Sequence, residues 1–382
     1  MEVLNNKRIV IVTSSASYES RAEKIGNFFK KNGYEVWWVE SDFVHREKRK
    51  GREKRKNHFY VDTISYKKNI SVRRLYSQFD FARKVGYLLN GKRIDLLYIM
   101  IPANSLAAAA VKLKAEQRLT LVLDIIDLWP ESLPIKGLMG FWPIEYWRKL
   151  RDNNLCKADL VLTECRLYQS ILGLEHSKTA TLYWPKEQAA SSALFHRRDD
   201  ILHIVYLGSI NHIIDMDMIL EILTEINRKR KVKLHVIGDG EKRGTFLERL
   251  EKSRIDTEYY GIVYDESKKQ EIFSRCSFGV NIMKPGVCVG LTMKSIDYFC
   301  YGVPLINNIP GDTWQLVDEY GIGINCEKED CKECAQRIMD AEGEMQEKRG
   351  LIQRLYNQLF TVQALEKVLE REVLPLLEKE DC

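Results

Sequence analysis

The chain has 382 residues, of which 45% are hydrophobic and 30% charged, and 59 Lys and Arg against 54 Asp and Glu give a formal net charge of +5. This composition is typical of a globular protein of about two domains and excludes disordered, fibrous and low-complexity classes. Residues 46–56 hold eight basic and two acidic residues, so this segment carries +6 and the rest of the chain −1. A nucleic-acid-binding protein spreads positive charge over a face or groove, so no nucleic-acid partner is expected.

The sequence predicts a cytoplasmic protein. Its longest uncharged stretch, 96–111, is shorter than the roughly 20 apolar residues that cross a bilayer. The N-terminus has an acidic residue at position 2 and no small-residue cleavage site, which argues against a signal peptide. Nine cysteines without a pairing pattern indicate reduced thiols. Cys326, Cys331 and Cys334 are expected to be surface thiols at a helix start, and no metal site is expected.

Strand and helix patterns alternate through the first half of the chain. The β-branched run in 7–15 predicts a buried parallel strand and a following loop that contains Ser14, Ser15 and Ser17. A helix follows and ends near Gly33. Further strands are predicted at 34–39, 94–101, 119–126 and 158–164, with a helix at 104–115. Repeated βα units with short connections predict a doubly wound parallel sheet with helices on both faces.

A second series of the same kind begins at residue 202. The predicted strands are 202–209, 232–238, 257–261, 277–283 and 303–308, and the predicted helices are 216–227, 242–252, 265–274 and 292–301. The separation of the two series near 185–200 predicts two Rossmann-like domains, 1–185 and 186–360. The apolar stripe over 351–376 predicts a long terminal helix. Its last part, 361–382, packs either back across the domain junction or on the second domain only.

Ligands of doubly wound sheets bind at the carboxyl ends of the strands, where helix N-termini offer free N–H groups. Gly208, Ser209 and Asn211 follow the first strand of the second domain. Their backbone and polar side chains suit a phosphate, although the same residues are also ordinary turn residues. Gly238 ends the next strand and is a further candidate for binding this phosphate, whereas the acids beside it suit helix capping.

The richest segment begins at Gly290, which makes a flexible loop before a helix that Leu291 and Thr292 open. Lys294 and Asp297 are expected one turn apart on the same face of this helix. The helix N-terminus together with Lys294 predicts a diphosphate site. An ionised Asp297 predicts a site for two vicinal sugar hydroxyls.

The stretch GLTMKSIDYFCYGVPLI, from Gly290, resembles the donor-binding segment of family-4 retaining glycosyltransferases. DIIDLWPES, from Asp124, resembles a motif of bacterial members that build capsule, O-antigen or exopolysaccharide. The order of the remaining parts agrees over most of the chain. The resemblance implies the GT-B fold, an α/β architecture of two Rossmann-like doubly wound parallel-sheet domains facing across a cleft. It implies a retaining transferase that uses a nucleotide-sugar, and UDP is the expected nucleotide. The candidate site residues include no obvious Asp-x-Asp metal site, so no cofactor or metal is expected.

Two departures from the family pattern bear on the donor site. The family commonly has two glutamates eight positions apart, and Asp297 matches the second while Val289 stands at the first. The Arg and Lys that follow the first strand's Gly in the family are absent after Gly208. Lys294 is therefore expected to meet the charge of the departing diphosphate. A non-catalytic glycosyltransferase-like partner subunit is the alternative, and the missing G-x-G-x-x-G after the first strand argues against a nicotinamide-dependent oxidoreductase.

Acceptor-side candidates lie in the first domain. Asp124 and Asp127 close a predicted strand, and Asp127 matches the Asp of the DLWPES motif. Either carboxylate is a candidate to orient the acceptor hydroxyl or to take its proton.

Two features of the sequence suit a membrane surface. Trp142 and Trp147 lie in an aromatic stretch flanked by basic residues, which fits either a membrane interface or an ordinary core. The basic segment is expected to attract anionic lipid or to be a solvated loop. Its basic residues are Arg46, Lys48, Arg49, Lys50, Arg52, Lys54, Arg55 and Lys56. Together these features predict peripheral association with the inner face of the plasma membrane and a lipid-linked saccharide acceptor in surface polysaccharide synthesis.

Overall fold

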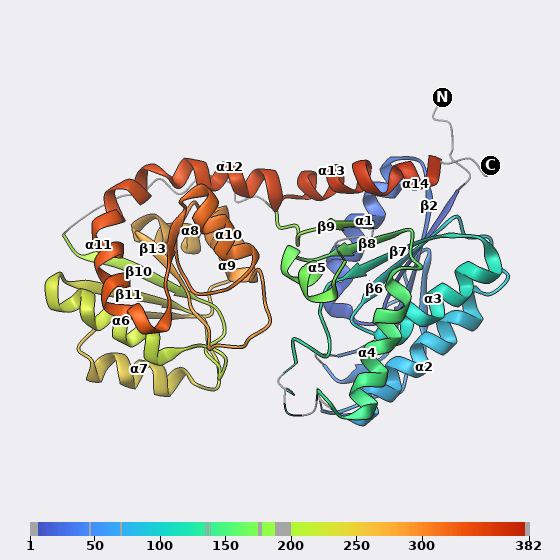
Figure 1. Cartoon of the computed structure of the whole chain (residues 1–382), viewed down its shortest axis with the longest axis horizontal. Helices are drawn as coiled ribbons and strands as arrows, with labels where there is room; N and C mark the ends of the chain where they lie inside the picture. Colours follow the sequence, from blue (N-terminus) through green and yellow to red (C-terminus); the bar gives the residue numbers. More distant parts are fainter. Residues whose placement is uncertain are drawn as a thin grey trace. The chain divides into compact units, whose positions relative to one another are not determined.

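The computed structural model describes residues 7–45, 47–68, 71–133, 135, 137, 139–174, 178–187 and 200–378. The chain divides into two compact units (Figure 1). Unit 1 comprises Met1–Pro185 and Val362–Cys382, and unit 2 comprises Lys186–Thr361. The predicted connection near 185–200 falls largely on 188–199, outside the described residues.

Unit 1 contains a seven-stranded parallel sheet in the order β5-β2-β1-β6-β7-β8-β9. The strands are β1 (Arg8–Thr13), β2 (Glu35–Ser41), β5 (His58–Val61), β6 (Leu96–Ile101), β7 (Thr120–Ile125), β8 (Leu160–Thr163) and β9 (Thr179–Thr181). Every residue of β6 is buried, as expected for an apolar strand with helices on both faces. The strand order reverses between β1 and β6, which is where a doubly wound sheet opens a ligand site.

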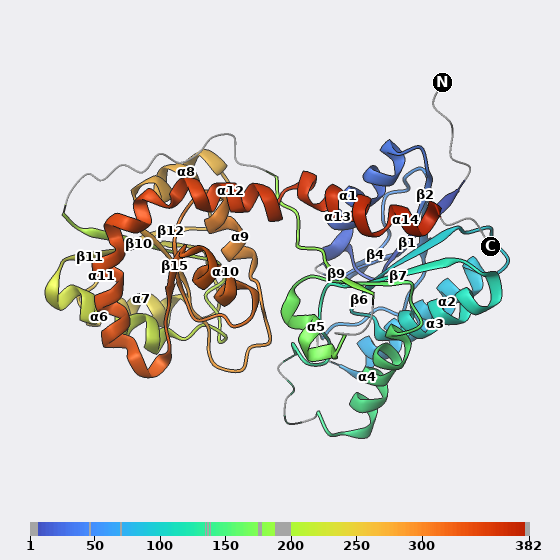
Figure 2. The ribbon, with the colours of Figure 1, turned by 45° about the horizontal axis from the view of Figure 1, so that its top comes forward.

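Helices cover both faces of this sheet (Figure 2). One face carries α1 (Glu19–Lys31), α13 (Val362–Glu372) and α14 (Leu374–Glu378), and the other carries α2 (Val72–Leu89), α3 (Asn104–Gln117) and α4 (Trp142–Leu155). Trp38 and Leu369 belong to the apolar cluster beneath the first face. The short helix α5 (Arg166–Leu172) follows β8.

Unit 2 repeats this plan with six parallel strands in the order β12-β11-β10-β13-β14-β15. They are β10 (Leu202–Leu207), β11 (Val232–Ile237), β12 (Asp256–Gly261), β13 (Phe278–Asn281), β14 (Leu305–Asn307) and β15 (Gly323–Asn325). One face carries α6 (Met216–Lys229), α7 (Arg243–Lys252) and α11 (Cys331–Glu347). The other carries α8 (Glu266–Arg275), α9 (Met293–Cys300), α10 (Asp312–Tyr320) and α12 (Arg349–Leu359). The strand order reverses between β10 and β13.

The expected long terminal helix is wrong in one respect, because the chain breaks at Phe360 and Thr361 into α12 and α13. Phe360 is buried in unit 2, with its ring centroid 5.8 Å from that of Phe299. Leu365 and Leu369 are instead buried in the core of unit 1. The apolar stripe is therefore divided between two cores, and the break lets each half face its own.

The expectation of reduced surface thiols is wrong for the cysteine cluster. Cys326 and Cys334 form a disulfide with their Cα atoms 5.7 Å apart, and Cys331 is buried beside them. Cys331 and Cys334 share the buried face of α11 with Ile338, at the spacing of one helix face. This face packs on the sheet, so the cysteines lie in the core.

Within the described part of the chain, no helix has both the length and the apolar character to cross a bilayer.

Candidate active site

The loops that follow β10 and β11 lie back to back in unit 2. Gly208 and Gly238 have φ of +126° and +139°, and a Cβ on Gly238 would lie 1.9 Å from the carbonyl oxygen of Gly208. No side chain fits there, so glycine at 238 is required by the contact between the loops. Gly238 thus supports the first loop, and its own contact with a phosphate stays a prediction.

The first loop brings three of the predicted donor residues together. A Cβ on Gly208 would lie 3.9 Å from Cδ of Lys294, so the bare backbone faces the lysine stem. Ser209 is exposed, and its hydroxyl accepts a hydrogen bond from Nδ2 of Asn211 at 3.3 Å. The carbonyl of Ser209 accepts from the hydroxyl of Tyr206 at 2.9 Å, which fixes the turn.

Lys294 is a buried cation at this point of the sheet. The residue is only 9% exposed, and its Nζ lies 5.4 Å from the ring centroid of Tyr206. Among the residues that the structure describes, no acid or hydrogen-bond acceptor pairs with this ammonium group. Burial lowers the pKa of Lys294 to about 7. Because an unpaired buried charge is unfavourable, the site suits an anion.

The N-terminus of α9 is fixed from within the protein. The hydroxyl of Thr292 accepts the backbone N–H of the third helical residue at 3.1 Å and donates to Oδ1 of Asn281 at 3.1 Å. The carbonyl of Gly290 accepts from the N–H and the hydroxyl of Thr313, both at 2.8 Å. Thr292 and Leu291 open the helix as predicted, but their side chains are 7% exposed. What they offer a ligand is the backbone.

An asparagine ladder supports this helix start, and its residues were not among the predicted site residues. Asn281, Asn307 and Asn325 end the neighbouring strands β13, β14 and β15 in register. Nδ2 of Asn281 donates to Oδ1 of Asn307 at 2.8 Å, and Nδ2 of Asn307 donates to Oδ1 of Asn325 at 2.8 Å. The signal available in the sequence was an asparagine within one predicted strand, 277–283, and another near the end of the next, 303–308.

Asp297 lies one turn along α9 from Lys294, but the two side chains have different surroundings. The carboxylate of Asp297 pairs with Nζ of Lys186, and its side chain is 20% exposed. Lys186 was not among the predicted site residues. It precedes the first strand of the second domain, and nothing in the sequence around it indicates that it pairs with Asp297.

Asp124 of unit 1 is enclosed by donors, which contradicts its predicted catalytic place. Arg21 donates to its two oxygens at 2.9 and 3.0 Å, and the hydroxyl of Tyr98 donates at 2.8 Å. The side chains of Asp124 and Arg21 are both fully buried. This pair ties β7 to α1, so Asp124 has no face left for an acceptor.

Asp127 lies beyond the end of β7 and differs from Asp124. It accepts a hydrogen bond from the hydroxyl of Tyr18, and burial raises the pKa of its carboxyl. Burial and the neighbouring Asp127 raise the pKa of Tyr18 well above its usual value. A role for Asp127 with the acceptor stays a prediction, now with Tyr18 as its donor.

A pocket lies beside Tyr18 at the carboxyl ends of β1, β2 and β6. The predicted residues Ser14 and Ser15 line it, together with Arg74, Gln78 and Trp129. The guanidinium carbon of Arg74 lies 4.2 Å from the Trp129 ring centroid, and Oε1 of the buried Gln78 has no hydrogen-bond partner in the described structure. Arg74 and Gln78 lie on α2, for which the sequence analysis predicted no element.

The aromatic stretch divides between surface and core. Trp142 is 72% exposed, whereas Trp147 is 5% exposed and packs on Trp129 with ring centroids 6.3 Å apart. Five residues turn the chain roughly 140° around a helix, so the two tryptophans of α4 point to different sides. The membrane interpretation is therefore wrong for Trp147, which is core.

The basic segment is folded against the domain, in contrast to the expected tether or loop. Its strand β4 (Arg49–Lys50) pairs with β3 (Phe43–Val44). Arg52 and Arg55 both pair with Glu19 and the buried Glu40. The predicted lipid contact is thus wrong for these two arginines, because acids of unit 1 neutralise them.

The remaining basic residues have mixed surroundings. Lys50 pairs with Asp62 and Arg49 with Glu47, while Nζ of Lys48 lies 5.1 Å from the Tyr66 ring centroid. Lys54 and Lys56 are exposed. Arg46 lies outside the described residues. The formal charge of +6 on this segment is therefore not exposed as one continuous basic surface, because several of its side chains are paired with acids.

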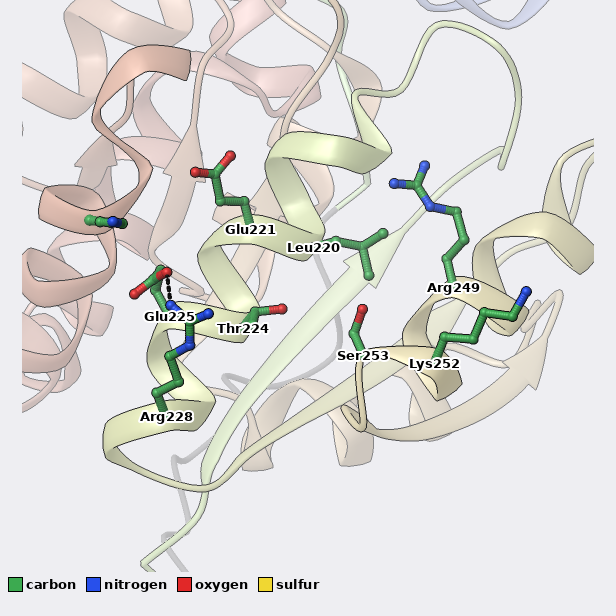
Figure 3. Close-up of a pocket in the computed structure, with 9 residues that line it drawn as sticks. Leu220, Glu221, Thr224, Glu225, Arg228, Arg249, Lys252 and Ser253 are labelled. Carbon is green, nitrogen blue, oxygen red and sulfur yellow. Dashed lines mark hydrogen bonds and ion pairs between the residues drawn. The ribbon is translucent and has the colours of Figure 1, made fainter.

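A pocket of unit 2 lies away from the strand ends, between α6 and α7 (Figure 3). Three of its basic side chains are paired with acids, so they do not form a free anion site. The pairs are Arg228 with Glu225, Arg249 with Asp217 and Lys252 with Glu248.

Part of unit 2 is similar to a known protein family. Residues 202–341 match the family described as "Glycosyl transferases group 1". No curated protein matches the chain in sequence.

Solved structures match over nearly the whole chain. The apo lipopolysaccharide outer core galactosyltransferase WaaB has a TM-score of 0.71 at 13% identity, covering 96% of this chain and 99% of that one. A glycosyltransferase from Rickettsia africae has a TM-score of 0.67 at 10% sequence identity, and the match covers 98% of this chain and 100% of that one. HepE of Anabaena in complex with UDP has a TM-score of 0.66 at 10% sequence identity, and the match covers 97% of this chain and 100% of that one. These likenesses confirm the predicted fold class, the GT-B fold of two Rossmann-like parallel-sheet domains.

Proposed function

Because the chain carries a glycosyl transferases group 1 domain in a GT-B fold, we propose that it is a retaining glycosyltransferase that uses a nucleotide-sugar, with UDP as the nucleotide. One observation carries the donor site: Lys294 is buried beside the N-terminus of α9 and has no counter-ion among the described residues. A donor diphosphate supplies the missing negative charge. HepE, similar in fold, was solved with UDP and with UDP-glucose.

In the proposed reaction the bond between the anomeric carbon of the sugar and the diphosphate oxygen breaks through an oxocarbenium-like transition state. The acceptor hydroxyl oxygen forms the new bond to that carbon on the same face, which retains the configuration. Lys294 and the backbone N–H groups from Gly290 to Thr292 stabilise the charge on the departing diphosphate. Ser209 donates its hydroxyl to the same phosphates, and Asp297 binds the ribose. No metal ion is needed in this scheme.

On the acceptor side we assign Asp127 to orient the acceptor hydroxyl or to take its proton. The hydroxyl of Tyr18 holds the carboxylate, and the raised pKa of Asp127 brings its proton affinity nearer to that required of a base. Asp124 contributes by fixing β7 through Arg21.

We further propose that the acceptor is a lipid-linked saccharide of surface polysaccharide synthesis, met at the inner face of the plasma membrane. Unit 1 has an aromatic face on α2 and α4, where the rings of Phe79 and Tyr146 stack with centroids 6.5 Å apart. Its members are Tyr76, Phe79, Phe141, Trp142 and Tyr146, each 41% to 72% exposed. Exposed aromatic side chains of this kind suit a lipid headgroup region.

Replacing Phe141 and Trp142 by serine is expected to weaken binding to vesicles with anionic lipid by on the order of tenfold, because two interfacial aromatic side chains are lost. Vesicle co-sedimentation measures this. Tyr264→Ser is the matched control, since Tyr264 is 84% exposed on unit 2. Equal vesicle binding by all three proteins would remove the aromatic face from the proposal.

The proposed activity is tested by incubating the protein with UDP-, GDP- and TDP-sugars and measuring release of the nucleotide. We expect turnover with one UDP-sugar, and a product whose anomeric configuration, read by NMR, matches that of the donor. Lys294→Ala is the control for contaminating hydrolases. Nucleotide binding without any turnover would favour the alternative, a non-catalytic partner subunit. Val289, which stands at the position of the family's first glutamate, supports that alternative.

A further inference from the structure

Asp297, the residue proposed for the ribose, is held at one of its two carboxylate oxygens. Nζ of Lys186 pairs with Oδ1, whereas Oδ2 has no hydrogen-bond partner among the described residues. The side chain is 20% exposed, so a ligand can reach it. A carboxylate has about four acceptor positions, and the contact with Lys186 therefore leaves room for hydroxyl donors.

Lys186 is itself fixed by the end of α12. Its backbone N–H donates to the carbonyl of Phe360 at 2.7 Å. The hydroxyl of Tyr356 contacts the carbonyls of Lys186 and Glu187 at 3.1 and 2.9 Å. The lysine side chain is 25% exposed, and burial lowers its pKa. This anchoring gives the ammonium group a defined position against α9.

The neighbouring acid is already engaged. Glu266 pairs with Lys269 and accepts a hydrogen bond from the hydroxyl of Tyr301. Asp297 is consequently the carboxylate that pairs with Lys186. Lys268 of α8 is exposed and does not contact Asp297, so it offers a control that leaves the pair of Glu266 and Lys269 intact.

We propose that Lys186 is a positioning residue for the nucleotide: it holds Asp297 by Oδ1 and so presents Oδ2 to the 2′-hydroxyl of the ribose. The consequence is a preference for ribonucleoside over 2′-deoxyribonucleoside diphosphates. Without the lysine the Asp297 carboxylate is free to rotate. Nucleotide binding must then pay the conformational entropy of fixing this side chain, which weakens the contact with the 2′-hydroxyl. This inference rests on the proposed function.

The test uses isothermal titration of the full chain with UDP and with 2′-deoxy-UDP. We expect the wild type to prefer UDP by about 10- to 100-fold, the effect of one hydrogen bond to a charged group. In Lys186→Met this preference falls towards one, donor KM rises about tenfold, and kcat changes less. Lys186→Arg restores most of the preference, and Lys268→Met behaves as the wild type.

A second variant separates positioning from folding. Asp297→Asn is expected to lose the same preference, and adding Lys186→Met to it is expected to cause no further loss. Wild type that binds no nucleoside diphosphate overturns the proposed function and this inference together. Wild type that binds UDP and 2′-deoxy-UDP equally, or a Lys186→Met variant that keeps the preference, overturns the role of Lys186 alone.

Discussion

Replacing Lys294 by alanine is expected to lower turnover by on the order of 10²-fold or more, which is the scale for losing a major electrostatic contact to developing charge. Lys294 has this weight because it is a buried cation with no counter-ion in the described structure. Steady-state kinetics with the donor found in the screen measure the loss. Wild-type turnover by Lys294→Ala, with unchanged donor affinity, would contradict the assignment.

Stability distinguishes this loss from misfolding. The pKa of Lys294 is lowered to about 7 by burial, so between pH 7 and the ordinary value of 10.5 the unfolded chain binds more protons at this residue. Lys294 therefore lowers the free energy of unfolding most at and below pH 7, where it is charged in the folded protein. This loss of stability becomes smaller as the pH rises towards 10.5. Lys294→Met is expected to raise Tm at pH 7 while abolishing turnover, with a gain that shrinks towards pH 9.5. Differential scanning calorimetry over this range measures it.

Replacing Asp124 by asparagine is expected to lower the free energy of unfolding by about 3–5 kcal/mol, because it leaves Arg21 as an uncompensated buried charge. Urea unfolding measures the change. Asp127→Asn, just beyond the end of β7, is the matched comparison: it is expected to keep nearly all of the stability and to lose on the order of 10²-fold in kcat.

A rescue sharpens the distinction between the two aspartates. Converting both partners, Arg21→Met with Asp124→Leu, is expected to recover much of the stability that Asp124→Asn loses, since no buried charge is then unpaired. If Asp124→Asn unfolded at the wild-type urea concentration, the ion pair would not be what holds β7 to α1.

The two sheets were predictable because their signal is local. Runs such as 8–13 and 202–207 are apolar and bounded by polar turns, which is the pattern of a strand buried on both faces. Gly208, Thr292 and Lys294 were predictable for the same reason, since each follows a strand or opens a helix. Burial on both sides leaves little freedom in how such segments can pair.

Other features depend on partners far apart in the sequence. The residues around Asp124 in the sequence do not indicate that Arg21 donates hydrogen bonds to both of its carboxylate oxygens. Those around Asp297 do not indicate that it pairs with Lys186. The charge of 46–56 suggested a tether because the acids that neutralise Arg52 and Arg55 lie on α1 and β2. An ion pair of this kind is set by the fold, not by spacing along the chain.

By itself, the sequence determined the α/β class, the two doubly wound sheets and the loop and helix around Lys294, because strand burial, glycine turns and helix starts are written in short segments. Only the tertiary structure decided which charges are free. It enclosed Asp124, divided Trp142 from Trp147 and left Lys294 without a counter-ion in the described part of the chain. The physical reason is that desolvation and pairing depend on what surrounds a side chain in space, and those neighbours come from every part of the chain.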